Sequence, residues 1–517
     1  MEGQAGLKKW GVLVVVCLAI FIMVIDTTIM NVSISALVVE LDTTVPAIQS
    51  VIAIYALIMA SFMLFGSRMQ DVMGRKRAFL FGVVLYGIGT FVASMSWNIG
   101  VLLVGWSVFE GVGAVFMMPA TATFLTAAYS GRDRAVAFGV WGGVAAAGAA
   151  FGPIIGGYLT SFYSWRWAFR LELLVVIVIL LASVLLSGSK PTEKFRNLDF
   201  VGMALSSAGL FLIVIGILQL KNLGVWRVIP FFIGGGLLLL AIFFWWERRV
   251  RQAGGVPLVE TSLLGDRMFL VGNLVGSLQT AVFAGFLFII PVFLQSVTGI
   301  GAFETGIALL PISMAVFIVS IGGARFSAVI DSKYLVLIGM ALGIWGTVML
   351  RDIFSVETTA EMIVPGSVVF GVGMGLVLSQ ITNLTLSAAP EEEQTDASGV
   401  LNTTKQLGTS VGTALIGVVL LISVFSGLLA AVDASGYFEG MEREEIAGEI
   451  DRWVEKMETG TPEEIPTPVL AEAERVADAS ISQAMKSSFD AILALLFIGF
   501  FASFLIPQVR REGGRVR

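Results

Sequence analysis

The feature that most constrains this chain is a series of about fourteen long apolar stretches, each close to the roughly 20 residues that a helix needs to cross a bilayer. They extend over nearly the whole chain and are separated mostly by short polar loops. We expect spanning helices at 11–38, 46–69, 77–96, 99–120, 136–160, 169–188, 199–219, 228–247, 267–297, 303–326, 334–350, 361–388, 397–430 and 487–507. Backbone polar groups in lipid must be satisfied within the protein, so the predicted fold class is an all-α polytopic membrane protein.

The composition points to the same class. Hydrophobic residues make up 56% of the 517 residues and charged residues only 14%, against roughly 25% charged in soluble proteins. Histidine is absent, and the single cysteine, Cys17, excludes a disulfide within the chain and a cysteine metal site. Proton chemistry near neutral pH must therefore use carboxyl groups, whose neutral form is favoured by burial.

Lysine and arginine are unevenly divided between the two sets of loops. Most lie near the two ends of the chain and in alternate loops, for example at Lys8, Arg75 and Arg248. The positive-inside rule then predicts a multi-pass protein of the cell membrane with both termini in the cytoplasm. No cleavage site follows the first apolar stretch, so we expect it to remain as the first helix.

The longest polar segment, 431–485, is strongly acidic and is predicted to lie outside the cell. Within it, Met441–Met457 and Val469–Met485 have the pattern of amphipathic helices. Two interpretations stay open, a solvated hairpin over the exit and a surface that attracts cationic substrates.

The sequence also repeats itself at an offset of 260 positions. Glycines 139, 148, 152 and 157 recur at 399, 408, 412 and 417, the Gly-Val-Gly of 111–113 recurs at 371–373, and Asp71 recurs as Asp331. We therefore predict an N-terminal six-helix bundle (1–190), an inserted helix pair (191–264) and a C-terminal six-helix bundle (265–517) that includes the acidic segment. Parallel repeats of this kind are a transporter architecture, with the binding site near the midplane between the halves.

Two local motifs stand out, the first in the loop after the second helix. It consists of Gly66, Asp71, Gly74, Arg75, Lys76 and Arg77. Asp71 can pair with an arginine or cap a helix, and glycines permit tight turns. The motif predicts a conformational latch between two bundles, with an ordinary basic loop as the alternative.

The second motif is a row of small residues in the fifth helix. It consists of Gly139, Gly148, Gly152, Pro153, Gly156 and Gly157. Glycines on one helical face let two backbones approach closely, and a proline bends the helix.

These motifs resemble the loop signature of the major facilitator superfamily and the antiporter signature of its drug:proton exporters. The segments Ile25–Val32, Trp165–Phe169 and Leu198–Gly202 are similar to the fourteen-helix branch of those exporters. The resemblance covers about residues 10 to 425 and the last helix. It implies export of hydrophobic, cationic small molecules in exchange for protons by alternating access.

The chain departs from the family pattern at two places. Ser107 stands where the family has an arginine that is associated with proton coupling. After Trp165–Trp167 the family has an asparagine-x-proline, whereas this chain has Glu172-Leu-Leu174, preceded by Arg170.

Some ionisable residues fall inside predicted helices. A charge at mid-membrane costs about 2.5–3.5 kcal/mol on insertion scales, so such residues usually face a cavity. Asp26 shares a polar stripe with Thr27 and Asn31, and we predict that this stripe meets the substrate. Glu110, near the centre of the fourth helix, is predicted to carry the proton.

Alternatives remain for these residues. Asp26 and Glu110 could instead each form a pair between helices, for example with Lys405 or Arg170. For Arg170 and Glu172, which are predicted to lie close to the outer surface, an interfacial salt bridge and a role in substrate binding are both open.

Three classes of function are compatible with these observations. The first is the proton-coupled exporter, and the second is a lipid-moving or uncoupled facilitator of the same fold, which Ser107 favours. The third is a membrane enzyme or sensor, but the sequence shows no metal or nucleophile constellation, no ATP-binding P-loop and no cytoplasmic domain. We predict a monomeric transporter rather than an enzyme, with no cofactor or metal. Its expected partners are an amphiphilic small molecule, protons and membrane lipids, but no nucleic acid.

Overall fold

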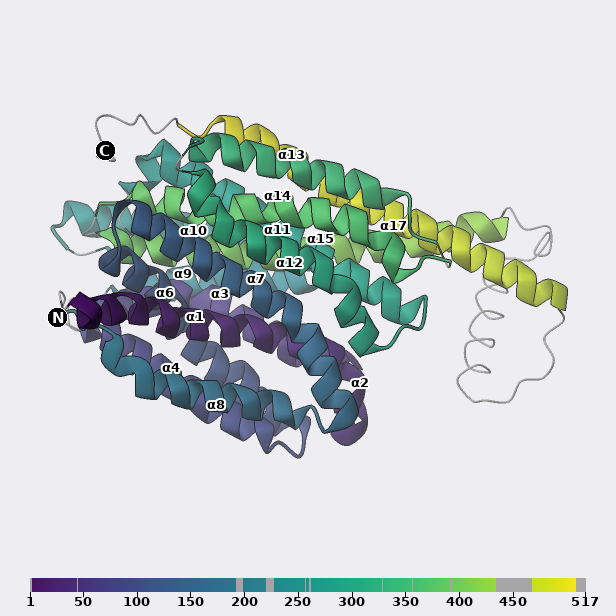
Figure 1. The fold of residues 1–517 in the computed structure, drawn as a ribbon, viewed down its shortest axis with the longest axis horizontal. Coiled ribbons are helices and arrows are strands. Elements are labelled where there is room, and N and C mark those ends of the chain that lie inside the picture. Colours follow the sequence, from purple (N-terminus) through teal and green to yellow (C-terminus); the bar gives the residue numbers. More distant parts are fainter. Residues whose placement is uncertain are drawn as a thin grey trace.

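The computed structural model describes residues 2–43, 45–191, 199–219, 227–255, 257–259, 262–327, 329–355, 357–390, 393–433 and 467–507. Every regular element in these ranges is a helix. Within these ranges, 14 helical segments are long and apolar enough to cross a membrane, and they lie side by side along the long axis (Figure 1). The predicted fold class, an all-α polytopic membrane protein, is therefore confirmed.

The elements follow the predicted order closely. Those of the first half are α1 (Glu2–Val32), α2 (Ile34–Glu40), α3 (Val45–Met73), α4 (Arg75–Ser94), α5 (Ile99–Leu102), η1 (Leu103–Glu110), α6 (Gly111–Ala128), α7 (Gly131–Phe162), α8 (Arg166–Ala182) and η2 (Ser183–Leu185). The pair between the halves is α9 (Phe200–Leu218) and α10 (Ile229–Gln252). Those of the second half are η6 (Leu263–Gly265), α11 (Arg267–Ser296), α12 (Ala302–Phe326), α13 (Ser332–Arg351), α14 (Ala360–Ser387), α15 (Gln394–Asp433) and α17 (Thr467–Phe504).

Two expected spans are interrupted. The span expected at 11–38 is broken at Ser33, whose hydroxyl lies 2.7 Å from that of Thr160 in α7. The fourth span consists of α5, η1 and α6 in succession, and η1 is a π-helix of eight residues.

The acidic segment differs from the expectation in one respect. Val469–Met485 is helical, but it forms the first part of α17 and continues into the last spanning helix. The other predicted amphipathic helix, Met441–Met457, lies outside the described residues.

Helix packing follows one reciprocal pattern in the two halves. α7 packs against α1 of its own half and α12 of the other, while α15 packs against α11 of its own half and α3 of the other. A Cβ atom at Gly148 in α7 would lie 3.2 Å from the carbonyl oxygen of Phe21 in α1. A Cβ atom at Gly412 in α15 would likewise meet Ala281 in α11. This correspondence supports the proposed division into two related bundles, with α9 and α10 packed together beside α3.

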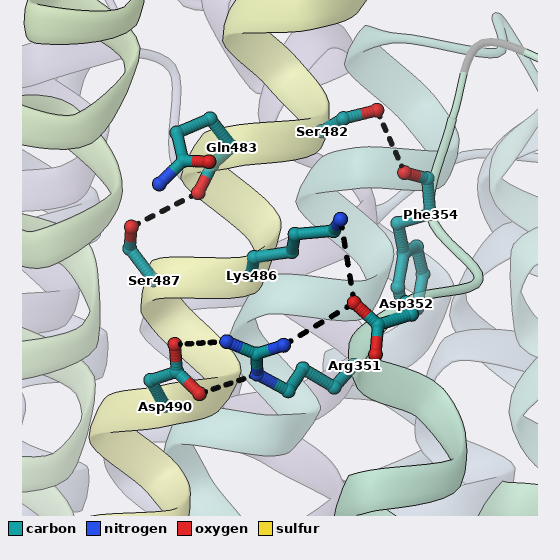
Figure 2. A network of polar contacts seen from close by, with 8 residues as sticks. All are labelled: Arg351, Asp352, Phe354, Ser482, Gln483, Lys486, Ser487 and Asp490. Atoms are coloured by element: carbon teal, nitrogen blue, oxygen red, sulfur yellow. Dashed lines mark hydrogen bonds and ion pairs between the residues drawn. The ribbon is translucent and has the colours of Figure 1, made fainter.

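We call the end of the bundle where α1 begins the N-terminal face, and the other end the opposite face. At the opposite face, Arg351 ends α13 and donates to Asp490 of α17 at 2.8 Å and to Asp352 at 3.3 Å. Lys486, one turn before Asp490, lies 3.3 Å from Asp352 (Figure 2). These contacts link the end of α13 to α17 at the surface of this face.

Candidate functional site

Three acidic side chains from three separate elements meet inside the first half. They are Asp26 of α1, Glu110 at the end of η1 and Glu172 of α8, and one oxygen of each lies within 4.8 Å of the others. None of the three residues is more than 1% exposed. We call this group the carboxyl cluster.

Few hydrogen bonds satisfy the carboxyl cluster. The indole Nε1 of Trp106 donates to Asp26 at 2.9 Å, and the hydroxyl of Tyr86 donates to Glu172 at 3.2 Å. Both oxygens of Glu110 lack a hydrogen-bond partner within the described part of the chain, as does one oxygen of Asp26 and one of Glu172. Buried polar atoms normally have partners, so these oxygens indicate a site that takes up something from outside the chain.

The charge of the cluster is also uncompensated. Among the described residues no lysine or arginine forms an ion pair with it, and the buried hydroxyl of Tyr55 faces Asp26 without a well-formed hydrogen bond. Two unit charges 4.8 Å apart repel by about 3.5 kcal/mol at an effective dielectric constant near 20. Three carboxylates therefore require protons or another hard cation, for which oxygen atoms are suitable ligands.

The local backbone brings Glu110 to this position. A Cβ atom at Gly89 of α4 would lie 2.7 Å from the backbone nitrogen of Glu110, and one at Gly105 would lie 2.6 Å from that of Ala93. The glycines therefore let α4 and η1 touch backbone to backbone. A π-helical turn at such a contact is frequent at functional sites.

The other predicted binding residues are placed differently. Thr27 donates to a carbonyl of its own helix at 2.9 Å, and Asn31 lies in α1 with a side chain outside the described ones. Arg170 is exposed and lies over the ring of Trp167, at 5.0 Å, whereas Glu172 is buried in the cluster. The side chains of Arg170 and Glu172 leave α8 in different directions, so the two do not form the interfacial salt bridge that was left open.

The cations considered as partners for Glu110 also lie elsewhere. Lys405 of α15 donates to the hydroxyl of Thr382 at 2.6 Å, and Arg170 points outward. Ser107, at the position of the family arginine, donates to the carbonyl oxygen of Val51 at 2.6 Å. Its hydroxyl joins η1 to α3 and brings no positive charge.

A second polar group joins the two halves at the N-terminal face. Arg68 of α3 donates to Asp71 at 3.0 Å, to Asp396 of α15 at 2.9 Å and to the carbonyl of Pro257 at 2.8 Å. Gly66 precedes it, and a Cβ atom there would collide with Val115 of α6. We call Arg68, Asp71 and Asp396 the latch. Pairing of Asp71 with an arginine was one of the two possibilities that the sequence left open, but the contact of that arginine with Asp396 has no signal in the sequence.

The rest of the loop motif connects α4 to the end of the first half. Gly74 has a φ of 83°, and a Cβ atom there would lie 2.6 Å from the carbonyl oxygen of Ser189. The backbone N–H of Arg75 donates to the Ser189 hydroxyl at 2.9 Å, and Lys76 donates to a nearby carbonyl at 3.1 Å. Arg77 is exposed.

The glycines of the fifth-helix motif face α1. The place of a Cβ atom at Gly152 is taken by Thr28, and one at Gly156 would lie 2.9 Å from the carbonyl oxygen of Ile29. The other motif residues in α7 are also buried: Gly139, Gly148, Pro153 and Gly157. Small residues thus bring α7, which contacts the other half, against the helix that carries Asp26.

Comparisons with known proteins bear on the family and the fold of the chain. The sequence model of the Major Facilitator Superfamily matches residues 16–200 and 200–413. The chain is 28% identical over 448 residues to the probable actinorhodin transporter of Streptomyces coelicolor, covering 84% of this chain and 76% of that protein. It is 27% identical over 406 residues to the multidrug resistance protein Stp of Mycobacterium tuberculosis, covering 78% and 74%. The solved structure of the proton:xylose symporter XylE is similar in fold, with a TM-score of 0.60 at 11% identity, over 98% of this chain and 97% of that one.

Proposed function

Because this chain belongs to the Major Facilitator Superfamily and is a multi-pass transmembrane transporter with drug-exporting relatives, we propose that it exports hydrophobic small molecules in exchange for protons by alternating access. The carboxyl cluster carries this proposal. Three buried carboxyl groups without a cationic partner must bind and release protons or another cation during each transport cycle.

Glu110 is the proton-binding group in this proposal. Neither of its oxygens accepts a well-formed hydrogen bond among the described residues, since the nearby Thr90 hydroxyl donates to the carbonyl of Tyr86, whereas Trp106 donates to Asp26 and Tyr86 donates to Glu172. A carboxylate that receives hydrogen bonds is stabilised in its charged form. Of the three groups, Glu110 therefore has the most to gain from a proton.

The latch supports alternating access. Arg68 and Asp396 belong to different halves, and Ser67 also donates across to the carbonyl of Thr395 at 2.6 Å. These contacts join the two halves at the N-terminal face. We propose that this face is cytoplasmic, because most loop lysines and arginines lie there, and that the protein works as a monomer in the cell membrane.

A cationic substrate, as the sequence predicted, would compete with protons for Asp26. Such a substrate has to enter the first half, because the side chains found around the cluster all come from it. The alternative, a lipid-moving or uncoupled facilitator, is favoured by Ser107 and would not depend on the cluster changing its charge.

The test is transport by the purified protein in liposomes, with rhodamine 123 as the cationic dye and only a pH difference as the driving force. Glu110→Gln should abolish uphill transport but keep dye binding and downhill exchange. Asp26→Asn should weaken binding of a cation more than of a neutral compound. The matched control is Glu361→Gln, an exposed acid at the start of α14. If Glu110→Gln still concentrates the dye, the assignment is wrong and the uncoupled function gains.

A further inference from the structure

A buried lysine lies between the two halves of the protein. Lys405 of α15 is 7% exposed. Its Nζ donates to Thr382 of α14 at 2.6 Å and lies 5.7 Å from the ring centre of Trp141. Trp141 belongs to α7, in the first half, whereas α14 and α15 belong to the second. The lysine head group is therefore shared between the halves.

Both residues lie inside the spans of their helices. Lys405 follows the start of the α15 span at Gln394 by a distance of about 16 Å along the helix axis. Trp141 follows the start of α7 at Gly131 by about 15 Å. The first turns of the two helices carry charged residues, Arg132 and Asp133 in α7 and Asp396 in α15, so the apolar part of each span begins later and both side chains lie in the half of the hydrocarbon core nearer the N-terminal face. Repeats related by an axis along the membrane normal place their substrate sites between the halves.

The site offers hydrogen-bond donors that lack acceptors. An ammonium group has three N–H donors, and Lys405 uses one on Thr382. The described residues place no carboxylate within ion-pair distance of it. The indole Nε1 of Trp141 is buried and also has no acceptor there. Gly276 of α11 faces the lysine chain, with a Cβ position 3.7 Å from Lys405 Cε, and supplies no side-chain acceptor.

A buried charge without a partner is costly, and a hydroxyl and an aromatic ring compensate only part of that cost. A negatively charged ligand would supply the missing acceptor, since it can accept hydrogen bonds from the Lys405 ammonium group, the Trp141 indole and the Thr382 hydroxyl. We propose that Lys405, Trp141 and Thr382 bind the acidic group of an aromatic organic anion that the protein transports. This inference rests on the proposed export function and adds carboxylates and ionised phenols to its substrates.

The experiment compares two dyes with the same xanthene ring system and opposite charge, fluorescein as the anion and rhodamine 123 as the cation. Equilibrium binding to the full-length protein in detergent is measured by fluorescence anisotropy, and transport is measured in liposomes with a pH difference. The variants are Lys405→Gln, Lys405→Arg and Trp141→Phe. Lys333→Gln is the control, because Lys333 lies at the N-terminal face and its ammonium group donates, among the contacts described, only to the backbone carbonyl of Phe504.

We expect Lys405→Gln to weaken fluorescein binding about tenfold or more and to leave rhodamine 123 binding unchanged or tighter. Lys405→Arg should retain most of the fluorescein affinity, and Trp141→Phe should lose a smaller part of it. Lys333→Gln should behave as the unmodified protein.

The outcomes separate this inference from the proposed function. Equal weakening of both dyes by Lys405→Gln would indicate a structural role and overturn the anion site, as would unchanged fluorescein binding. Transport of rhodamine 123 without any fluorescein binding would also overturn it, while the export function would stand. Fluorescein binding that depends on Lys405, without pH-driven transport of either dye, would support the site and contradict the exporter.

Discussion

Removing one charge from the latch should open the N-terminal face. Arg68 is 12% exposed, and it contacts Asp71 of its own helix and Asp396 of the other half. In Asp396→Asn the amide oxygen can still accept from Arg68, but the charge on the acceptor is lost. Charge-assisted hydrogen bonds are roughly twice as strong as neutral ones.

The size of the effect follows from that difference. A hydrogen bond to a charged group contributes about 1.5–3 kcal/mol, and a neutral one about 0.5–1.5 kcal/mol. The loss is therefore about 1–1.5 kcal/mol, and it destabilises the closed state because Asp396 and Arg68 lie in different halves. The ratio of closed to open molecules should fall by a factor of about 5–13. The bond from Ser67 to Thr395 remains and keeps part of the closed population.

The opening can be measured as a distance between spin labels. Arg132, at the start of α7, and Arg267, at the start of α11, are exposed residues of opposite halves at this face. With Cys17 replaced by serine, cysteines at these two positions carry nitroxides, and pulsed dipolar spectroscopy gives the distance distribution. Asp396→Asn should increase the long-distance fraction.

A nearby acid provides the matched control. Glu393 precedes Asp396 by three residues, and the one described contact of its carboxylate is a long hydrogen bond of 3.5 Å from the hydroxyl of Ser262, so Glu393→Gln should leave the distribution unchanged. Asp71→Asn should misplace Arg68 and abolish transport without reducing expression. If Asp396→Asn leaves the distances unchanged while Asp71→Asn alters them, the contact between halves is not the latch and the reasoning fails.

Three further predictions concern packing and the surface. Gly152→Val should lower the stability by about 1–3 kcal/mol in thermal unfolding, because Thr28 fills the Cβ position. Gly188→Ala, which has open space around it, should leave the stability unchanged. Equal melting temperatures of the two variants would contradict the close α1–α7 contact. Gly74→Ala should destabilise the loop by roughly 1–2 kcal/mol, because its φ is 83°, and an unchanged melting temperature would show that the loop adopts another backbone. Arg351→Gln should change neither melting nor transport measurably, because surface ion pairs contribute little, and a large loss of transport would give the network of Figure 2 a role in the cycle.

The sequence predicted the helices better than it predicted the contacts between them. An apolar stretch of about 20 residues has only one stable form in lipid, so the number and order of the spans follow from hydropathy. Interruptions depend on tertiary contacts instead. The helix break at Ser33 comes with a contact to Thr160 in α7, and the π-helix at Leu103–Glu110 comes with the close approach of α4. Neither partner is near in the sequence.

The carboxyl cluster shows the same limit. The cost of a charge in a spanning helix points to Asp26 and Glu110, but their convergence depends on how each helix is rotated about its axis. Glu172 lies six residues into α8, so the sequence predicts a position near the outer surface. The rotation of α8 about its axis instead buries the side chain in the carboxyl cluster. Tyr55 and Tyr86 gave no signal, because tyrosines are ordinary in membrane helices.

The carboxyl cluster should release protons when a cationic substrate binds. With the carboxyl oxygens within 4.8 Å of one another, each pair of negative charges repels by about 3.5 kcal/mol, so the cluster must hold protons whenever no other cation is present. When the two halves move apart and admit water or substrate, the cluster would release these protons. Addition of rhodamine 123 to the detergent-solubilised protein in unbuffered solution should therefore acidify the medium, and a pH-indicator dye measures the protons released per protein. Replacing Glu110 and Glu172 together by glutamine leaves one carboxyl group, which can lose at most one proton, so the release should fall while dye binding persists. An undiminished release from that double variant would place the exchanging protons outside the cluster, and a release that sodium or calcium ions suppress in the unmodified protein would show that the cluster takes a metal cation in their place.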